Sequence, residues 1–324
     1  MESSLIIFQQ MLVLISMMAI GYVVYRLKWV GEITEQQLSK LVVNVFNPVL
    51  VVSGVLGRAQ TGAQALILEN LKGVFLYYAL LIFLGFVGSR LLRSRREERN
   101  QYQLMFVFSN VGFMGIPVLS ALYGKDCLLF ITFYLLVYNF LLYTYGIAVA
   151  RRGAGAKTSA EAEPGAAAAG ERVKTAAWKK LLNPGVAACI LAILIFTLQI
   201  PVPEAAVTFF DYVGNATIPL SMMIIGISVA KMSWKDIFSN VRMYLFCVLK
   251  LLAVPIAASL LLRPLFQERM LFEIFVFMLS MPVGSIVTMI SNEYGNGETV
   301  CSQGIILSTL LSMITIPVVS LFLF

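Results

Sequence analysis

Two short polar segments interrupt long apolar runs and could together bind a small solute. The first runs from Ser109 to Pro117 and the second from Ser280 to Ser285, and they contain Asn110, Gly112, Gly115, Pro117, Ser280, Pro282, Gly284 and Ser285. Glycine permits unusual backbone conformations and proline lacks an amide donor, so both segments free backbone groups from helical bonding. In hydrocarbon, each freed group is costly unless protein or a water-filled cavity satisfies it. The segments therefore predict a polar cavity in which helix N-termini favour an anion.

Within the first segment we expect the helix to open at Pro117. The proline ring clashes with the carbonyl four residues back, on Phe113, and removes one donor. Asn110 would then offer an amide that both donates and accepts beside the freed backbone. The alternative is that both breaks are ordinary proline kinks that help helices to pack, because Gly and Pro are common in membrane helices.

Lys250 lies near the centre of the apolar run 240–262. A charge there is costly, and its long distance from either end of the run excludes snorkelling. We expect Lys250 to be the counter-charge of an anionic substrate or a titrating group; the alternative is a structural tether to a facing carbonyl.

Two further polar groups occupy apolar runs, namely Asn44, Asn47 and Pro48 in one and Asn215 and Pro219 in another. Asparagine in hydrocarbon needs partners. These side chains either line the path of a substrate or ion or form hydrogen bonds between helices.

Enzyme chemistry is not indicated anywhere in the chain. The sequence contains no histidine, its four cysteines are scattered singly, and Gly226-Ile227-Ser228 has no histidine to act as a base. We therefore expect no catalytic residues, no metal site and no cofactor.

The composition is that of a membrane protein, since 59% of the 324 residues are hydrophobic and 13% are charged. Runs long enough to span a bilayer as helices occur at 5–26, 36–56, 72–92, 101–123, 127–150, 183–200, 205–230, 240–262, 272–293 and 299–323. The sequence thus predicts an all-α integral membrane protein with ten transmembrane helices.

The distribution of basic residues predicts the topology and argues against nucleic acid as the partner. Eighteen of the 24 Lys and Arg residues flank the first, third, fifth and seventh loops, and five flank the even loops. By the positive-inside rule the odd loops are cytoplasmic and both termini lie outside. The cluster from Arg93 to Arg99 would also contact anionic membrane lipids.

An internal repeat is indicated by matches 171 positions apart. Ser109 pairs in this way with Ser280, Asn44 with Asn215, Pro48 with Pro219, and Tyr123-Gly124 with Tyr294-Gly295. The polar segment 151–181 cannot bury a core and is expected to be a flexible cytoplasmic linker, with a regulatory or partner-binding loop as the alternative. It separates a five-helix repeat at 1–150 from one at 182–324, and because five is odd the second repeat is inverted.

The motifs resemble those of the auxin efflux carrier family of bacterial permeases, relatives of the plant PIN auxin carriers. The resemblance rests on Asn110 to Pro117, on Met281-Pro282 and on Asn47-Pro48, and covers the chain except 151–181. It implies a fold like that of sodium/proton antiporters, in which broken helices 4 and 9 cross at their prolines. Asn110, Gly112, Gly115, Pro117 and Pro282 would mark the crossover and the substrate cavity. One departure is that relatives often have asparagine shortly after the ninth-span proline, where this chain has Ser285 and Ile286.

The resemblance also implies a scaffold of spans one, two, six and seven, a homodimer, and a transport domain that moves as an elevator. We expect a secondary transporter of the cytoplasmic membrane that moves a small organic anion, a mono- or dicarboxylate, with sodium or protons as candidate coupling ions. One alternative is a cation antiporter, which usually needs a buried Asp or Glu near the crossover. Another is a membrane sensor or lipid-binding protein that no longer transports.

Overall fold

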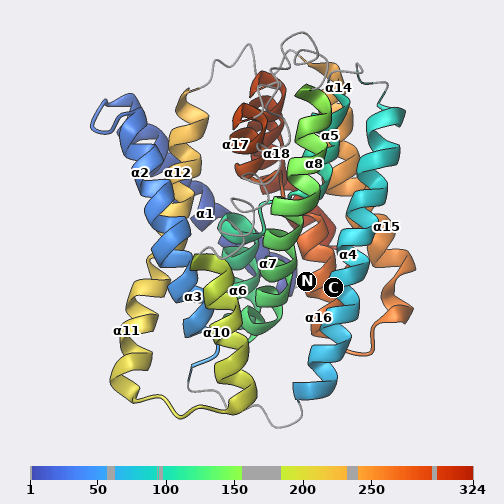
Figure 1. Cartoon of the computed structure of the whole chain (residues 1–324). Coiled ribbons are helices and arrows are strands. Elements are labelled where there is room, and N and C mark those ends of the chain that lie inside the picture. Colours follow the sequence, from blue (N-terminus) through green and yellow to red (C-terminus); the bar gives the residue numbers. More distant parts are fainter. Residues whose placement is uncertain are drawn as a thin grey trace, which may run out of the picture.

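The computed structural model describes residues 2–56, 63–92, 94, 98–154, 184–231, 240–293 and 298–323. In this part of the chain all regular secondary structure is helical (Figure 1). The first half contains α1 (Glu2–Arg26), α2 (Glu32–Leu41), α3 (Asn47–Ser53), α4 (Ala63–Leu91), α5 (Arg99–Val107), α6 (Ile116–Tyr123), α7 (Cys127–Leu141) and α8 (Ile147–Ala154). The second half contains α10 (Pro184–Leu198), α11 (Glu204–Asn215), α12 (Thr217–Lys231), α14 (Val241–Val248), α15 (Val254–Leu261), α16 (Arg269–Leu279), α17 (Ile286–Glu293) and α18 (Glu298–Ser320).

Six helices within the described residues are long and apolar enough to cross a membrane. They are Phe8–Arg26, Leu66–Leu91, Val111–Arg152, Glu204–Lys231, Val241–Leu261 and Val300–Ser320. Helix is the expected state of such runs, because only intrahelical bonds satisfy every backbone group in hydrocarbon. The fold is thus that of a multi-pass membrane protein, while the number of ten spans and the inverted repeat remain predictions.

Wider, π-helical turns interrupt several helices just before a proline. In each of three cases the turn ends two residues ahead of the proline: η1 (Val42–Phe46) before Pro48, η2 (Val111–Gly115) before Pro117, and η6 (Leu249–Ala253) before Pro255. The extra residue in a π-helical turn provides an amide-to-carbonyl bond over five residues and relieves the proline clash. Our expectation that the helix opens at Pro117 is therefore wrong, because Pro117 lies in the first turn of an intact α6.

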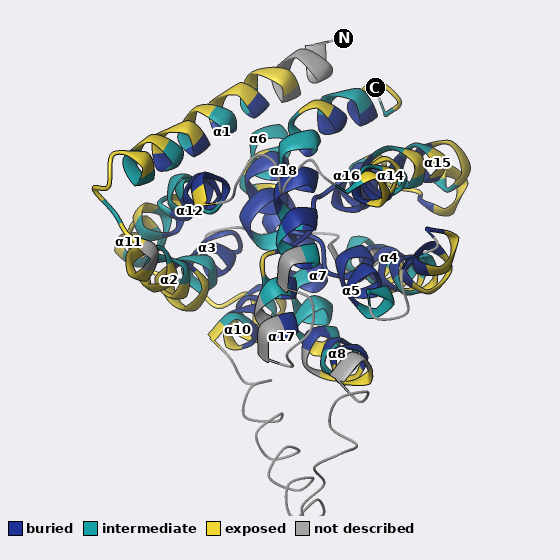
Figure 2. Cartoon of the chain, turned by 90° about the horizontal axis from the view of Figure 1, so that it is seen from above, coloured by how far each residue is buried: buried dark blue, intermediate teal, exposed yellow. Residues whose placement is uncertain are grey.

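The helices form two groups on either side of a central set (Figures 1 and 2). On one side, α1 packs on α12, α11 and α10 pack on α3, and α12 also contacts α2. On the other side, α4 packs against α5 and α16, and α15 packs against α16. Figure 2 shows that buried residues concentrate in the centre, whereas α1 exposes one of its faces.

Close backbone contact joins α1 to α12. A Cβ atom placed on Gly21 would lie 2.1 Å from the carbonyl oxygen of Met223, and one on Gly226 would lie 2.0 Å from that of Met18. Small residues at helix contacts let membrane helices approach until their backbones touch. These two glycines therefore make α1 and α12 a tightly joined pair.

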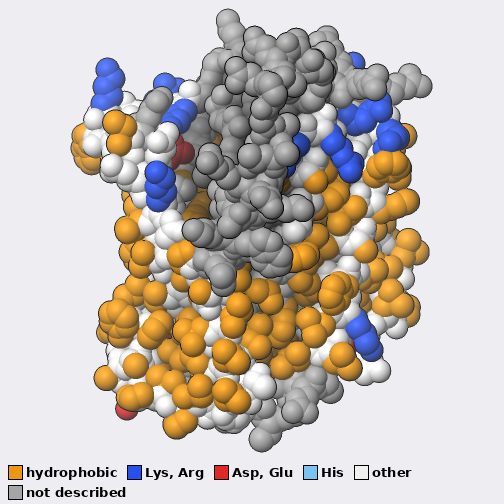
Figure 3. Space-filling model, viewed as in Figure 1, with side chains coloured by type: hydrophobic (Ala, Val, Ile, Leu, Met, Phe, Trp, Pro, Cys, Tyr) orange, Lys and Arg blue, Asp and Glu red, His pale blue; other side chains and the backbone are white. Residues whose placement is uncertain are grey.

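The visible surface is divided into an apolar band and a basic end (Figure 3). Hydrophobic side chains cover the middle and lower part of this face, and most of the visible Lys and Arg side chains gather towards the end that lies uppermost. Such a band suits contact with hydrocarbon. The Tyr294-Gly295 pair and most of the segment 151–181 lie outside the described residues, as does part of the basic cluster from Arg93 to Arg99.

Candidate functional site

Both polar segments interrupt their helices with non-helical backbone. Helix α5 ends at Val107 and the π-helical turn η2 begins at Val111, whereas α16 ends at Leu279 and α17 begins at Ile286. The second break falls at Pro282 and Gly284, where it was expected. The first falls at residues 108–110, well before the proline.

The two breaks cross and hydrogen-bond to each other as a short antiparallel bridge, with Ser109 opposite Val283. The N–H of Asn110 donates to the carbonyl of Pro282 at 2.7 Å, and the N–H of Gly284 donates to that of Phe108 at 2.9 Å. The Val283 N–H donates to the Ser308 hydroxyl of α18 at 3.0 Å. Backbone groups freed in one helix are thus satisfied by the other helix, which is what a low-dielectric interior requires.

Gly284 allows this close approach. A Cβ atom at this position would lie 3.2 Å from the Ser109 carbonyl oxygen, 3.3 Å from that of Phe108 and 3.1 Å from the Tyr138 hydroxyl. Two of these three neighbours are backbone atoms of the other break and cannot rotate away. A larger residue would therefore push the two chains apart.

A cavity of about 210 Å³ adjoins the crossing. It lies between the breaks, the run α2–η1–α3, α7 and α10. Its polar lining consists of Ser39, Asn44, Asn47, Ser109, Asn110, Tyr138, Asn139 and Ser285. None of its lining residues is Asp, Glu, Lys or Arg. A site of this kind holds a solute by amides, hydroxyls and helix ends and not by direct contact with an ionised side chain.

Asn110 is a buried polar side chain of this cavity, and its amide oxygen is held in place. It is 7% exposed, and its Oδ1 accepts a hydrogen bond from the N–H of Phe113 at 3.1 Å, which caps the helix that starts at Val111. Its Nδ2 donates to no group within the described part of the chain. Because the cap fixes the oxygen, the two N–H donors of the amide remain available to a ligand.

Only some of the residues predicted from the sequence reach the cavity. Asn110, Gly112, Gly284 and Ser285 line it, as do Asn44, Asn47 and Pro48 from η1 and α3. Gly115, Pro117, Ser280 and Pro282 lie outside its lining, as do Asn215 and Pro219. The Ser280 hydroxyl, for example, donates to the Phe277 carbonyl within α16.

Lys250 lies behind the crossing and outside the cavity lining. Its side chain is 1% exposed, and its Nζ donates to the carbonyl of Phe106 at 2.9 Å and to the hydroxyl of Ser109 at 2.8 Å. The bond to Phe106 is what we expected of a structural tether to a facing carbonyl, which was the alternative role for Lys250. A role of its charge in substrate binding remains a prediction.

Three polar residues of the cavity lining escaped the sequence reasoning, namely Ser39 of α2 and Tyr138 and Asn139 of α7. The Asn139 amide donates to the Leu135 carbonyl at 2.8 Å, and the Tyr138 ring lies edge-on to Phe108, with centroids 5.5 Å apart. An asparagine inside an apolar run was the available signal. It was overlooked because it has no neighbouring proline and no counterpart at the repeat offset.

A second, smaller cavity of about 30 Å³ lies between the crossing, α12 and α18. It shares Asn110, Phe113 and Ser285 with the larger cavity, and Ser228 and Thr309 add polar groups. The Ser228 hydroxyl donates to Glu35, which is also paired with Lys231. Side chains at the two breaks thus border both cavities, which differ in volume.

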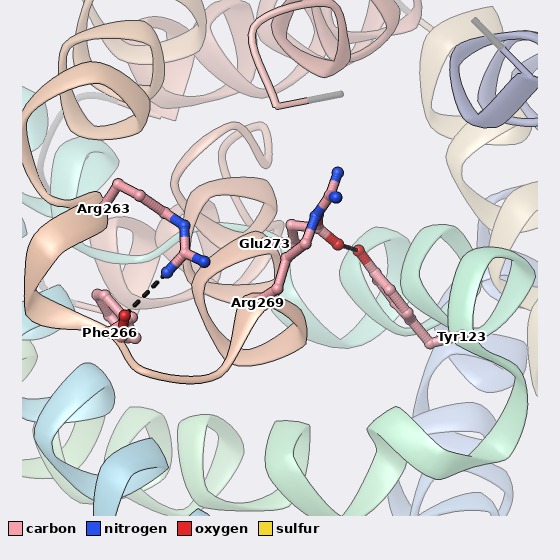
Figure 4. Close-up of polar contacts among 5 residues, drawn as sticks. All are labelled: Tyr123, Arg263, Phe266, Arg269 and Glu273. Carbon is pink, nitrogen blue, oxygen red and sulfur yellow. Dashed lines mark hydrogen bonds and ion pairs between the residues drawn. The ribbon is translucent and has the colours of Figure 1, made fainter.

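The buried acid Glu273 lies in the first half of α16 and lines neither cavity; Figure 4 shows its contacts. It is 4% exposed, accepts a hydrogen bond from the Tyr123 hydroxyl and pairs with Arg269 at 2.6 Å. In the same view, Arg263 donates to the Phe266 carbonyl at 2.8 Å. Glu273 therefore ties the end of α6 to α16 and does not line the cavity.

Residues 6–320 match the family described as membrane transport protein. The comparison with curated proteins found no match. The family match runs through both breaks, both cavities and nearly the whole described structure.

Proposed function

The chain belongs to the membrane transport protein family, the auxin efflux carrier or PIN-like family, and we propose that it is a secondary transporter for a small organic anion, a carboxylate. The resemblance seen in the sequence is thereby confirmed at the level of the family. The carboxylate binds at the crossing and is released on the other side of the cytoplasmic membrane by alternating access.

The observation that supports this proposal most is the combination of an uncharged cavity with unused donors at the crossing. The Asn110 amide lines the cavity, and its N–H groups have no partner among the residues that the structure describes. Ser285 is exposed there, just before the first residue of α17. A helix N-terminus and side-chain amides favour an anion without a direct salt bridge.

The alternative function, a cation antiporter, has less support. Such proteins usually bind the cation through a carboxylate, and neither cavity is lined by Asp or Glu. The carboxylate that contacts a residue of the smaller cavity is Glu35, which is already paired with Lys231. A paired acid at a cavity edge is a poor cation ligand.

The elevator mechanism is supported by how the helices group. The predicted scaffold spans one, two, six and seven correspond to α1, α2–α3, α10 and α11–α12, which contact one another on one side of the molecule. The crossing helices lie against this group and are bounded by cavities on two faces. In the proposed cycle, the transport domain slides along the scaffold. This movement opens the site to one side of the membrane through the larger cavity and to the other side through the smaller one. Ten spans in two inverted repeats, termini outside, a homodimer and coupling to sodium or protons complete the proposal.

Flux through reconstituted protein tests the function. Purified full-length protein in liposomes is expected to take up malate or a hydrophobic monocarboxylate such as phenylacetate under an imposed sodium, proton or substrate gradient. Absence of uptake for both acids under all three gradients would overturn the proposal.

Ligand-dependent thermal stabilisation tests the site and separates transport from sensing. The same acids should raise the unfolding temperature of the wild type, and Asn110→Ala and Lys250→Ala should reduce that shift. Full stabilisation of both variants would remove these residues from the site. Stabilisation of the wild type without any flux would instead favour a membrane sensor.

A further inference from the structure

Two buried hydroxyls of α12 have no partner in the chain. Many serine and threonine side chains of this protein donate to a carbonyl of their own helix, as Thr132 of α7 does at 2.8 Å. Thr217 and Ser221 are 2% and 0% exposed, but their hydroxyl oxygens lack a hydrogen bond within the described part of the chain. Ser120 and Thr315 share this state, each on a different helix. An unsatisfied buried hydroxyl is costly, so a neighbouring pair on one helix indicates a bound water or ion.

The two hydroxyls of α12 face the run α2–η1–α3, which lies beside α12 (Figures 1 and 2). One turn before them, Gly214 packs on this run, since a Cβ atom placed there would lie 2.9 Å from the Cα atom of Leu50. Two turns after them, Ser228 donates to Glu35 of α2. Positions 214, 217, 221 and 228 recur at the three- and four-residue spacing of one helix face. The hydroxyls therefore lie between two observed contacts on that face.

The register of these two contacts places Thr217 level with Asn47. The contacts are 14 positions apart along α11–α12 and 15 apart along the facing run, which has the opposite direction. The difference of one is the extra residue of the π-helical turn η1. Thr217 follows Gly214 by three positions and Asn47 precedes Leu50 by three, so both lie at one level. Ser221 lies one turn further, level with η1.

Asn47 adds a third oxygen atom in the same state. Its Oδ1 is buried and has no hydrogen-bond partner among the residues that the structure describes. Its amide nitrogen lies on the side of η2, 3.6 Å from a Cβ atom placed on Gly112. Asn47 also lines the larger cavity. Three uncharged oxygens, of Asn47, Thr217 and Ser221, thus lie where α3, η1 and α12 adjoin that cavity.

The chemistry of these oxygens suits a small monovalent cation. Hard cations prefer oxygen ligands. A divalent cation needs carboxylates to offset its desolvation, but the larger cavity is lined by none, and Glu35 at the end of this face is already paired with Lys231. An anion would meet the lone pairs of the Asn47 oxygen, which only accepts.

We propose that Asn47 Oδ1, Thr217 Oγ1 and Ser221 Oγ bind one sodium ion, which gives the larger cavity the positive charge that its own lining lacks. The ion site itself does not depend on a substrate. Its effect on the anion rests on the proposed function: a cation beside the cavity attracts the bound carboxylate, and each ligand strengthens the binding of the other by the same factor. Sodium, and not the proton, is then the coupling ion.

Thermal unfolding of the purified full-length protein, without carboxylate, tests the ion site. Sodium chloride should raise the unfolding temperature above that in potassium or N-methylglucamine chloride at equal ionic strength, because a ligand of the folded state stabilises it. Thr217→Val keeps the shape of the side chain and should abolish this sodium-specific rise. In N-methylglucamine it should unfold no earlier than the wild type, since the lost hydroxyl has no partner in the chain. Thr132→Val, which removes a hydroxyl bonded within α7, is the matched control and should keep the rise.

Two results of this test would overturn the ion site. One is an equal sodium-specific rise in Thr217→Val and the wild type. The other is an equal effect of sodium and potassium on the wild type, which would make bound water the partner of the hydroxyls. If Thr217→Val does not fold, Ser221→Ala serves in its place and should also reduce the rise; a full rise in that variant has the same meaning.

Binding of phenylacetate with and without sodium tests the effect on the anion. Replacing N-methylglucamine by sodium should lower the Kd of the wild type about tenfold, a typical coupling between two sites, and that of Thr217→Val much less. A Kd that does not depend on sodium would overturn the coupling. Failure of the wild type to bind or move any carboxylate would defeat the proposed function and the coupling with it, whereas a sodium-specific rise in unfolding temperature would stand by itself.

Discussion

The two broken helices satisfy each other's backbone in nearly the same way but present different side chains to the cavity. In the first, Asn110 caps the following helix and keeps its amide donors for a ligand, and Lys250 closes the preceding helix. In the second, Ser285 immediately precedes α17, and the neutral Tyr77 hydroxyl donates to the Met278 carbonyl near the end of α16. The bridge between Ser109 and Val283 is thus a shared structural requirement, whereas the groups around it are free to differ. This asymmetry is where we expect substrate specificity to arise.

The largest expected effect contrasts Gly284, in the second break, with Gly112, in the π-helical turn that follows the first break. Gly284→Ala places a methyl group against two carbonyls of the other break, and overpacking of this kind costs about 1–3 kcal/mol of folding free energy. We expect a clear drop in unfolding temperature and loss of carboxylate uptake. Gly112→Ala meets only the Asn47 amide nitrogen, at 3.6 Å, and should change the folding free energy by less than about 1 kcal/mol. Equal sensitivity at both glycines would contradict the packing described for the crossing.

A smaller effect separates Asn110 from Ser285. Asn110→Ala removes a helix cap, worth about 0.5–2 kcal/mol, and also removes the donors available to the ligand. It should therefore lower both the unfolding temperature and the affinity for a carboxylate. Ser285→Ala removes a hydroxyl without a hydrogen-bond partner among the described residues, so only affinity should fall. Unfolding and ligand titration of the two variants decide this, and a strongly destabilised Ser285→Ala would count against it.

A substitution that reduces the asymmetry should change selectivity more than stability. Ser285→Asn introduces an amide at the N-terminus of α17, opposite that of Asn110. One added hydrogen bond should change the ratio of the malate and phenylacetate Kd values by about 2- to 10-fold, in favour of the diacid, because it has a second carboxylate to accept it. Competition between the two acids in an uptake assay measures the ratio. An unchanged ratio would show that Ser285 does not select the substrate.

The smallest expected effect lies beyond the crossing, at the ion pair between Lys125, in η3 (Gly124–Asp126), and Asp211 of α11. Both side chains are partly exposed, and such pairs contribute about 0–1 kcal/mol. Lys125→Ala should lower the unfolding temperature slightly at low salt, and the difference should vanish at high salt. A large loss that persists in salt would place an essential contact outside the crossing.

Local sequence patterns predicted the position of the second break correctly but placed the first break too late in the chain. Pro282 and Gly284 lie in the second break as expected, because no helix continues easily through both. In the first segment the prediction from the proline was wrong. A π-helical turn ahead of Pro117 relieves the clash of the proline ring, and the break occurs at residues 108–110. A proline predicts a local disturbance, and neighbouring helices decide whether it becomes a wider turn or a gap.

The residues that line the larger cavity could be predicted only in part. Asn44, Asn47, Asn110 and Ser285 were found because polar residues in apolar runs are conspicuous. Asn139 is equally conspicuous but was missed, and Asn215 was proposed although it lies outside the cavity lining. A helix turns each residue by a fixed angle, but which face meets the cavity depends on how whole helices pack.

The sequence by itself determined that this chain forms apolar helices, that two of them are interrupted, and that it belongs to a transport family. These properties depend on composition and on neighbours within a few residues, where propensity and hydrogen-bonding capacity act. Only the tertiary structure decided that Ser109 pairs with Val283, that Lys250 binds Ser109 and Phe106, and that it stands outside the cavity lining. Those contacts join residues more than a hundred positions apart, and their geometry is set by the packing of rigid helices, which no local pattern specifies.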